Sequence, residues 1–437
     1  MEYLRGLIGI VVLIGIAFLA SENRKAVNWK LVATGIGLQL VVGLLIIKID
    51  FMSELFHSVG KGFVTFLGFT TEGAKFLFSG LALNSYNAAN TNHQLGHIFA
   101  FQVLPTVIFF STVSSGLYYL GVLQKVVYGI AWVMARTMKL SGAESLSAAG
   151  NIFLGQTEAP LLVRPFIPNM TKSELLCLMT GGMATIAGGV LGAYVGMLGG
   201  DNPEQQATFA AHLLGASIMN APAGIVISKI MLPETQHDQI DSELVINKEK
   251  LGVNLIDAMA TGAAEGLKLA LNIGGMLLAF IAVIAAVNYG LQHIIGEITG
   301  LNAWVVETTN GTFKGFSLEY IFGQVFQVLA FAIGVEWKDA AQIGSLLGQK
   351  TAINEFIAYS NLAVMKDTNS ISPKSLIIAT YALCGFSNFS SIAIQVGGIG
   401  SLAPNQQGNL SKLGMRALLA ASLACLMTAT VAGAITD

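Results

Sequence analysis

The chain has 437 residues, of which 54% are hydrophobic and only 11% are charged, whereas about a quarter of the residues of an ordinary soluble domain are charged. Its 23 basic and 25 acidic residues give a formal net charge of −2, which argues against nucleic acid as a partner and against a solvating acidic tail. The three cysteines lie far apart in apolar stretches, without the spacing of metal ligands or redox pairs. The composition therefore predicts a multi-pass protein of an inner membrane.

Several apolar stretches approach or exceed the roughly 20 residues that cross a bilayer core of about 30 Å. We therefore predict an all-α polytopic membrane protein with about eight transmembrane helices. In chain order the predicted spans are 3–20, 29–47, 98–120, 175–198, 209–231, 267–287, 375–399 and 417–435. The first is interpreted as a helix and not as a signal peptide, because it lacks a small-residue cleavage site and a second span follows at once.

Three further segments mix apolar and charged residues and are predicted to lie along the membrane interface: 51–83, 122–139 and 254–265. The polar segment 233–250 is the clearest loop and divides the chain into two sections of comparable length. Basic residues favour cytoplasmic loops, and their modest bias predicts that both chain ends lie outside.

Two segments, 141–168 and 340–364, are apolar but are each interrupted halfway by a polar cluster. We predict that both are re-entrant hairpins, since lipid cannot satisfy free backbone groups and such segments must be buried in protein or line a wet cavity. Each is followed by a span that glycine and polar residues interrupt, at 181–189 and 384–391. Interruptions at corresponding places in two halves indicate a transporter with inverted repeats, broken helices and a binding site near the midplane.

Glu158 and Glu355 lie inside these hairpins, where an ionised acid costs about 2.5 to 3.5 kcal/mol. Such a cost favours a functional role, and their polar neighbours suit a ligand rich in hydroxyl groups. The alternative is structural: Glu158 pairs only with Arg164, and Glu355 only with Lys350.

Asn151 and Thr185, beside a glycine-rich turn, suggest a hard-cation site in which exposed main-chain carbonyls supply further oxygens, as in sodium-coupled transporters. The alternative is that Asn151 caps a hairpin helix and Thr185 bonds to its own helix.

Phe386 and Phe389 flank Asn388 and either pack in the core or stack on a planar ligand. Glycines at 188, 192, 196 and 200 are interpreted as a packing face.

The hairpin sequence Asn-Ile-Phe-Leu-Gly-Gln-Thr-Glu-Ala-Pro from Asn151, the Asn-Glu-Phe at 354–356 and the Gly-Phe-Ser-Asn-Phe-Ser-Ser at 385–391 closely resemble the concentrative nucleoside transporter family. The order of spans, interfacial helices and hairpins resembles the bacterial, eight-span, sodium-coupled form over nearly the whole chain. The resemblance implies a homotrimer in which a scaffold surrounds a threefold axis and an outer transport domain carries the ligand. The expected units are scaffold helices in 1–139, a first transport repeat in 140–232, a cytoplasmic loop and scaffold span in 233–335, and a second transport repeat in 336–437.

The resemblance also implies a role for individual residues. In the substrate site, Gln156, Thr157 and Glu158 would contact the nucleobase, Glu355, Asn388 and Ser391 would hold the ribose hydroxyls, and Val190 and Phe386 would line the base pocket. In the sodium site, the side chains of Asn151 and Thr185 would act with main-chain oxygens of Leu154, Thr185 and Ile186. Thr185 stands where the family pattern leads us to expect serine, and it keeps the hydroxyl.

The expected function is import of uridine-like nucleosides across a bacterial inner membrane, driven by the sodium gradient through elevator-type movement, with sodium as coupling ion and no other cofactor. A proton-coupled symporter of the same fold is the main alternative. An intramembrane enzyme that uses Glu158 and Glu355 as acid and base is disfavoured, because no nucleophile or metal motif accompanies them.

Overall fold

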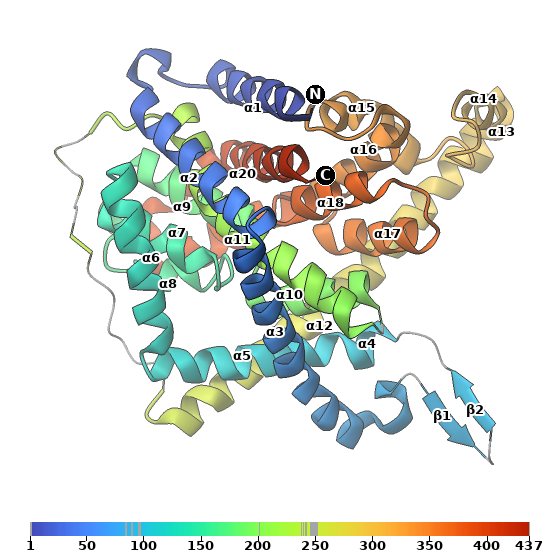
Figure 1. Cartoon of the computed structure of the whole chain (residues 1–437), viewed down its shortest axis with the longest axis horizontal. Coiled ribbons are helices and arrows are strands. Elements are labelled where there is room, and N and C mark those ends of the chain that lie inside the picture. Colours follow the sequence, from blue (N-terminus) through green and yellow to red (C-terminus); the bar gives the residue numbers. More distant parts are fainter. Residues whose placement is uncertain are drawn as a thin grey trace.

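The computed structural model describes residues 2–83, 85–88, 91–94, 98–200, 202–236, 238, 240, 243–244 and 252–436. These residues form a helical protein with one antiparallel strand pair, β1 (Ser85–Ala88) and β2 (Thr91–Gln94), in which Ser85 pairs with Gln94. The pair projects from one corner of the molecule (Figure 1). The fold is therefore that of an all-α polytopic membrane protein, as the composition predicted.

The first three helices form one flank of the molecule: α1 (Glu2–Leu19), α2 (Trp29–Ile47) and α3 (Asp50–Phe78). Asn28 begins α2 by accepting a hydrogen bond from the main-chain N–H of Leu31. Within the long helix α3 the buried residues are Gly60, Leu67, Thr70 and Ala74. Their spacing of three, four and seven residues is that of a single helical stripe, as the amphipathic pattern predicted.

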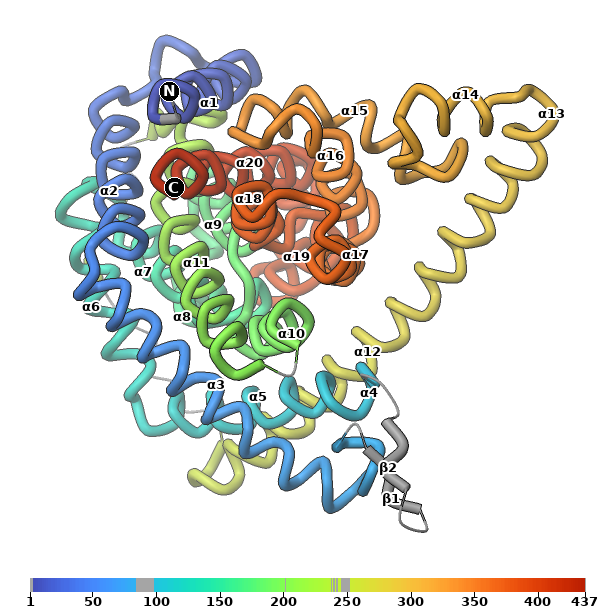
Figure 2. The backbone as a smooth tube through the Cα atoms, turned by 45° about the vertical axis from the view of Figure 1, so that its right-hand side comes forward, coloured from blue at the N-terminus to red at the C-terminus, as the bar shows by residue number. Residues whose placement is uncertain are grey.

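A second layer is built from α4 (Phe99–Gln102), α5 (Leu104–Tyr119), α6 (Val122–Met138) and α12 (Leu255–Tyr289). Glycines let α12 approach α5 closely, because an added Cβ would lie 2.5 Å from Ser115 Oγ at Gly262 and 2.8 Å from Ile108 Cα at Gly266. Beyond this contact α12 extends away from the other helices toward α13 (Glu297–Thr299) and α14 (Leu301–Thr308), as Figure 2 shows.

The predicted hairpins and broken spans are confirmed as helix pairs with a non-helical break. In the first half these are α7 (Gly142–Asn151) with α8 (Ala159–Leu162), and α9 (Lys172–Ala184) with α10 (Gly188–Gly199), followed by α11 (Pro203–Met231). In the second half they are α16 (Trp337–Ala352) with α17 (Glu355–Asp367), and α18 (Pro373–Leu383) with α19 (Phe389–Leu402), followed by α20 (Gln407–Ile435). The helix α15 (Leu318–Ala332) precedes α16 and makes an angle of 118° with it.

The prediction of about eight transmembrane helices agrees with the fold, although length and apolarity alone identify fewer of them. Six helices of the described chain are long and apolar enough to cross a membrane, or up to seven if α15 and α16 count as one bent span. The two other predicted spans are α1, whose stretch Tyr3–Leu19 is apolar but shorter, and 375–399, which is broken between α18 and α19. The predicted interfacial segment 254–265 is also different, because it is the first part of the continuous helix α12.

The core lies where the broken helices meet α11 and α20. The share of buried residues is 94% in the most apolar stretch of α9 and α10, 83% in that of α20 and 78% in that of α11, but only 11% in that of α12. The second half of the chain therefore contributes both to the core and, through α12, to the outermost surface.

A buried ionic cluster holds the starts of two helices in the first half. Ser141 with Glu144, and Thr171 with Glu174, form reciprocal caps at the beginnings of α7 and α9. The buried Lys229 of α11 forms an ion pair with Glu144 and donates a hydrogen bond of 2.9 Å to Ser173. The cluster thereby fixes the first hairpin and the broken helix after it on α11.

Candidate functional site

The two broken helices come together at a single side chain of α11. Asn220 donates hydrogen bonds of 2.7 Å to the main-chain oxygens of Ala184 and Cys384, at the breaks that follow α9 and α18. Gly385 permits this close approach, because an added Cβ would lie 2.7 Å from Ala184 O and from Cys425 Sγ. Carbonyl groups at helix ends lack partners within the helix, so Asn220 satisfies one such group from each half.

A separate chain of buried polar contacts connects both hairpins with the second break. Gln156, at the tip of the first hairpin, donates to Ser391 Oγ across 3.1 Å. Asn388 caps α19 by accepting from the main-chain N–H of Ser391 at 2.9 Å, and its side-chain amide donates to Glu355 Oε2 at 3.0 Å. Four of the predicted substrate residues are therefore joined, although they come from three separate segments.

Two members of this polar chain were missed in the sequence. Tyr194 of α10 donates a hydrogen bond of 2.8 Å to Glu355 Oε1, and its ring stacks on that of Tyr359 with centroids 4.3 Å apart. Gln395 of α19 donates to Gln156 Oε1 at 3.2 Å and to Met179 O at 3.1 Å. Gln395 is also buried, so it extends the site into the second broken helix.

Within the described residues, the other predicted substrate residues form no side-chain hydrogen bond to this polar chain. Thr157 is exposed, and the partly buried Glu158 accepts a 3.3 Å hydrogen bond from the main-chain N–H of Gly155 in its own loop. Val190 is buried on α10, one turn before Tyr194. Phe386, at the second break, is half-buried against the core.

The ion-pair interpretation of Glu355 is not supported. Its carboxylate accepts hydrogen bonds from Tyr194 and Asn388, whereas the ammonium group of the buried Lys350 donates to Ala382 O at 2.9 Å. Lys350 therefore bonds to the last turn of α18 and leaves both oxygens of Glu355 with neutral donors.

The predicted sodium residues surround the first break. Asn151 is the last residue of α7, and both polar atoms of its buried side chain lack a hydrogen-bond partner within the described chain. The main-chain oxygens of Leu154, Thr185 and Ile186 likewise accept no hydrogen bond from the described residues. The hairpin tip lies against the break, because the N–H of Gly188 donates to Phe153 O at 3.1 Å. A buried amide without a partner is costly, so these oxygen atoms fit a small hard cation.

Thr185 is compatible with both interpretations of its hydroxyl, as a bond to its own helix and as a cation ligand. Its hydroxyl donates to Gly181 O at 2.9 Å, which is the helix bond of the structural interpretation. The hydroxyl oxygen keeps lone pairs for a cation. The alternative role of Asn151 as a cap is not supported, because its side chain forms no bond to the main chain in the described structure.

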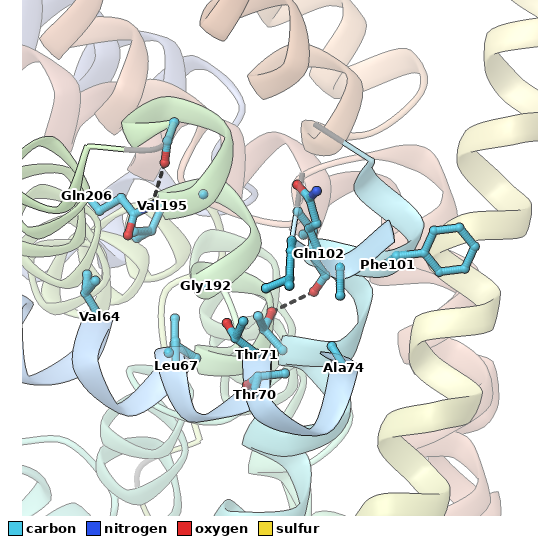
Figure 3. A pocket seen from close by; sticks show the side chains of 17 residues that line it. Val64, Leu67, Thr70, Thr71, Ala74, Phe101, Gln102, Gly192, Val195 and Gln206 are labelled. Atoms are coloured by element: carbon cyan, nitrogen blue, oxygen red, sulfur yellow. Dashed lines mark hydrogen bonds between the residues drawn. The ribbon is translucent and has the colours of Figure 1, made fainter. Parts of the chain in front are cut away.

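A cavity of about 350 Å³ lies beside the site, between α3, α4 and the glycine side of α10 (Figure 3). Leu67 and Thr70 of α3 and Gly192 and Val195 of α10 are among the residues that line it. None of the predicted site residues lines this cavity. The predicted packing role of the glycines is confirmed at two positions, because an added Cβ would lie 2.2 Å from Phe110 at Gly188 and 2.7 Å from Leu67 at Gly192. It is not confirmed at Gly196, where the nearest neighbour would lie at 4.0 Å, or at Gly200, which follows the end of α10 with a φ of +56°.

Comparison with known proteins agrees with this geometry. Residues 8–81 match the profile described as the Na+ dependent nucleoside transporter N-terminus, and residues 212–433 match the corresponding C-terminus. Residues 100–201, which include the first hairpin and first break, match a profile described as nucleoside recognition, or Gate.

Proteins from bacteria and mammals are similar over nearly the whole chain. An uncharacterized transporter of Haemophilus influenzae is 39% identical over 99% of this chain and 98% of its own length. Sodium/nucleoside cotransporter 1 of Rattus norvegicus is 40% identical over 99% of this chain, and solute carrier family 28 member 3 of Mus musculus is 39% identical over 98%. The chain spans only 64% and 58% of these two mammalian proteins.

Solved structures give the same result. The protein CNTnw in an inward-facing substrate-bound state matches with a TM-score of 0.87 and 37% identity, over 99% of this chain and 98% of that one. An outward-facing variant of CNTnw matches with a TM-score of 0.85. The fold is that of a multi-pass membrane transporter, and the matching family is one of transporters and not of enzymes. The chain belongs to the sodium-dependent nucleoside transporter family.

Proposed function

We propose that the protein imports nucleosides by symport with sodium ions. The observation that carries this proposal is the buried polar chain of Gln156, Ser391, Asn388 and Glu355. A carboxylate, two amides and a hydroxyl offer the acceptors and donors that ribose hydroxyls and a base edge require. Their origin in separate segments, which include both hairpins and the second break, makes binding dependent on the arrangement of those elements.

Within this site the base would contact Gln156, Thr157 and Glu158, and Val190 and Phe386 would line its pocket. The ribose hydroxyls would bind Glu355, Asn388 and Ser391. A ligand without the ribose cannot form these hydrogen bonds, each of which contributes about 0.5 to 1.5 kcal/mol, or more to a charged group. We therefore expect selection of nucleosides over free bases.

Sodium would bind at the first break, to the side chains of Asn151 and Thr185 and to main-chain oxygens of Leu154, Thr185 and Ile186. The unpaired amide of Asn151 supports this assignment. A tenfold sodium gradient with a membrane potential of about 100 mV supplies about 3.7 kcal/mol for one ion. That energy could sustain roughly a 500-fold nucleoside gradient.

We further propose that the two repeats, 140–232 and 336–437, move as one unit past a scaffold formed by 1–139 and 233–335. The smooth glycine side of α10 against α3 and α5, with the cavity beside it, supports a sliding interface. The apolar and largely exposed α12 supports a homotrimer in which scaffold helices of neighbouring copies meet, within a bacterial inner membrane.

Uptake of radiolabelled uridine into proteoliposomes tests this function. We expect uptake above the equilibrium level only with an inward sodium gradient. Uptake that persists without sodium and collapses with a protonophore would identify the proton-coupled alternative instead. Absence of uptake of any nucleoside by correctly oriented protein would overturn the proposal.

A further inference from the structure

A pair of glutamine side chains at the site presents a fixed pattern of donor and acceptor. Gln395 Nε2 lies 3.1 Å from the main-chain oxygen of Met179 and 3.2 Å from Gln156 Oε1. A main-chain carbonyl can only accept, so the Gln395 amide cannot turn its oxygen toward Met179 without facing acceptor to acceptor. Gly182 accommodates this amide, because an added Cβ there would lie 2.5 Å from Gln395 Nε2.

The orientation of Gln395 determines that of Gln156. Since Gln395 donates to Gln156 Oε1, the Nε2 of Gln156 must point the other way, where it donates one hydrogen to Ser391 Oγ. An amide nitrogen carries two hydrogens, so Gln156 keeps one donor for a ligand. Gln395 Oε1 is buried and has no hydrogen-bond partner in the described chain, so it remains available as an acceptor.

On the basis of the proposed nucleoside site, we propose that Gln395 and Gln156 select bases with an exocyclic carbonyl beside a ring N–H over bases with an exocyclic amino group. The free donor of Gln156 matches the carbonyl oxygen, and the free oxygen of Gln395 matches the ring N–H. Uracil, thymine, hypoxanthine and guanine have this edge, whereas cytosine and adenine carry an amino donor there. Gln395 is thus a residue that determines specificity by positioning Gln156 and by offering its own oxygen.

Nucleoside pairs that share the ribose isolate the contribution of the base edge to affinity. Only this edge differs between uridine and cytidine, or between inosine and adenosine. With purified full-length protein at saturating sodium, we expect dissociation constants roughly 10- to 100-fold lower for uridine and inosine. Equal or tighter binding of cytidine and adenosine would overturn the proposal. No binding of any of the four would instead count against the nucleoside site itself.

The substitution Gln395→Met removes the donor and the acceptor but keeps the length of the side chain. We expect the ratio of the dissociation constants for cytidine and uridine to fall to within about threefold of unity, because Gln156 can then turn its oxygen toward the amino group. The control is Gln39→Met: Gln39 is equally buried but bonds to Thr428 on α20, so its loss should leave the ratio unchanged. A ratio in Gln395→Met equal to that of the wild type would contradict the assignment, whatever the absolute affinity.

Discussion

The amide of Asn388 donates to a carboxylate oxygen of Glu355 across 3.0 Å, although the two residues begin different helices, α19 and α17. Tyr194 donates to the other oxygen, so both acceptors of Glu355 have a neutral donor. In Glu355→Gln one oxygen becomes an NH2 group that faces a donor. We expect nucleoside binding to weaken roughly 10- to 100-fold, since hydrogen bonds to charged groups contribute about 1.5 to 3 kcal/mol.

Isothermal titration with uridine measures this effect, and Glu336→Gln is the matched control. Glu336 precedes α16 and pairs with Lys338 at its surface, so its substitution should leave affinity within twofold. Affinity of Glu355→Gln within twofold of the wild type would contradict the proposed ribose role.

Tyr194→Phe removes one donor to Glu355 while the ring keeps its stacking on Tyr359. We expect uridine to bind roughly fivefold more weakly, because loss of one buried hydrogen bond costs about 1 kcal/mol. Tyr359→Phe removes a hydroxyl that bonds to Thr380 O instead. Equal losses in the two variants would show that packing, and not the bond to Glu355, explains the effect.

Substitution of the proposed sodium residues should weaken sodium binding before it affects nucleoside binding. We expect Asn151→Ala and Thr185→Ala to raise the sodium concentration at half-maximal uridine binding by roughly tenfold or more. Nucleoside affinity should decrease through this change, because coupling between two ligands is reciprocal. Titrations of sodium at fixed uridine test it, with Ser147→Ala as control, since the Ser147 hydroxyl bonds only within α7. Unchanged sodium midpoints in both variants would remove these residues from the ion site.

Asn220→Ala should disturb both breaks at once, because it leaves Ala184 O and Cys384 O without their amide donor. Both oxygens keep the thiol of Cys425 as a weak donor, at 3.4 and 3.3 Å. The loss of the two amide hydrogen bonds predicts a decrease of about 1 to 3 kcal/mol in stability, with changes in both sodium and nucleoside affinity. Thermal unfolding in detergent measures the stability, and titrations with sodium and with uridine measure the two affinities. Asn302→Ala removes a comparable amide bond to Gln292 O, far from the breaks in sequence, and should affect stability alone.

The surroundings of Glu234, which lies outside the membrane-spanning segments, predict that the stability of the fold depends on pH. Burial raises the pKa of this carboxyl, but hydrogen bonds from Thr171 and from two main-chain N–H groups, together with Lys229, lower it overall. A carboxyl with a lowered pKa stabilises the fold above its ordinary pKa of about 4.3, and this contribution is lost as the pH falls. Thermal midpoints at pH 7 and pH 4 should therefore differ less in Glu234→Gln than in the wild type. A difference of the same size in both would contradict the prediction.

The polar clusters at 155–158 and at 348–351 with Asn354 and Glu355 were sufficient to predict both hairpins, since lipid excludes free polar groups and backbone. In the second hairpin, however, 348–351 are still part of α16, and the break lies at 353–354. The interruption predicted at 384–391 also agrees with the end of α18 at Leu383 and the start of α19 at Phe389. The continuation of the segment 254–265 into the long helix α12 was less predictable from its mixed composition. The sequence did not identify Tyr194 as a site residue, because a tyrosine in an apolar helix is common. Its role depends on which side of α10 faces Glu355, which is a tertiary property.

Asn220 and Gln395 did carry a signal that was overlooked. Each is an amide side chain within an apolar stretch, and Pro222 follows Asn220 closely. Polar groups at membrane depth are costly and usually have a partner within the protein. Their partners, however, are main-chain oxygens of other helices, which only the packing of those helices reveals.

The crossing at Asn220 has an electrostatic consequence. The helices α9 and α18 both end there, and the C-terminus of a helix carries the equivalent of about half a negative charge. The end of α18 is compensated by the ammonium group of Lys350, which is bonded to Ala382 O. Among the described residues, no cationic side chain forms a hydrogen bond to the end of α9. On the proposed sodium assignment, the ion at the first break would lie at the end of α9, just as the ammonium group of Lys350 lies at the end of α18.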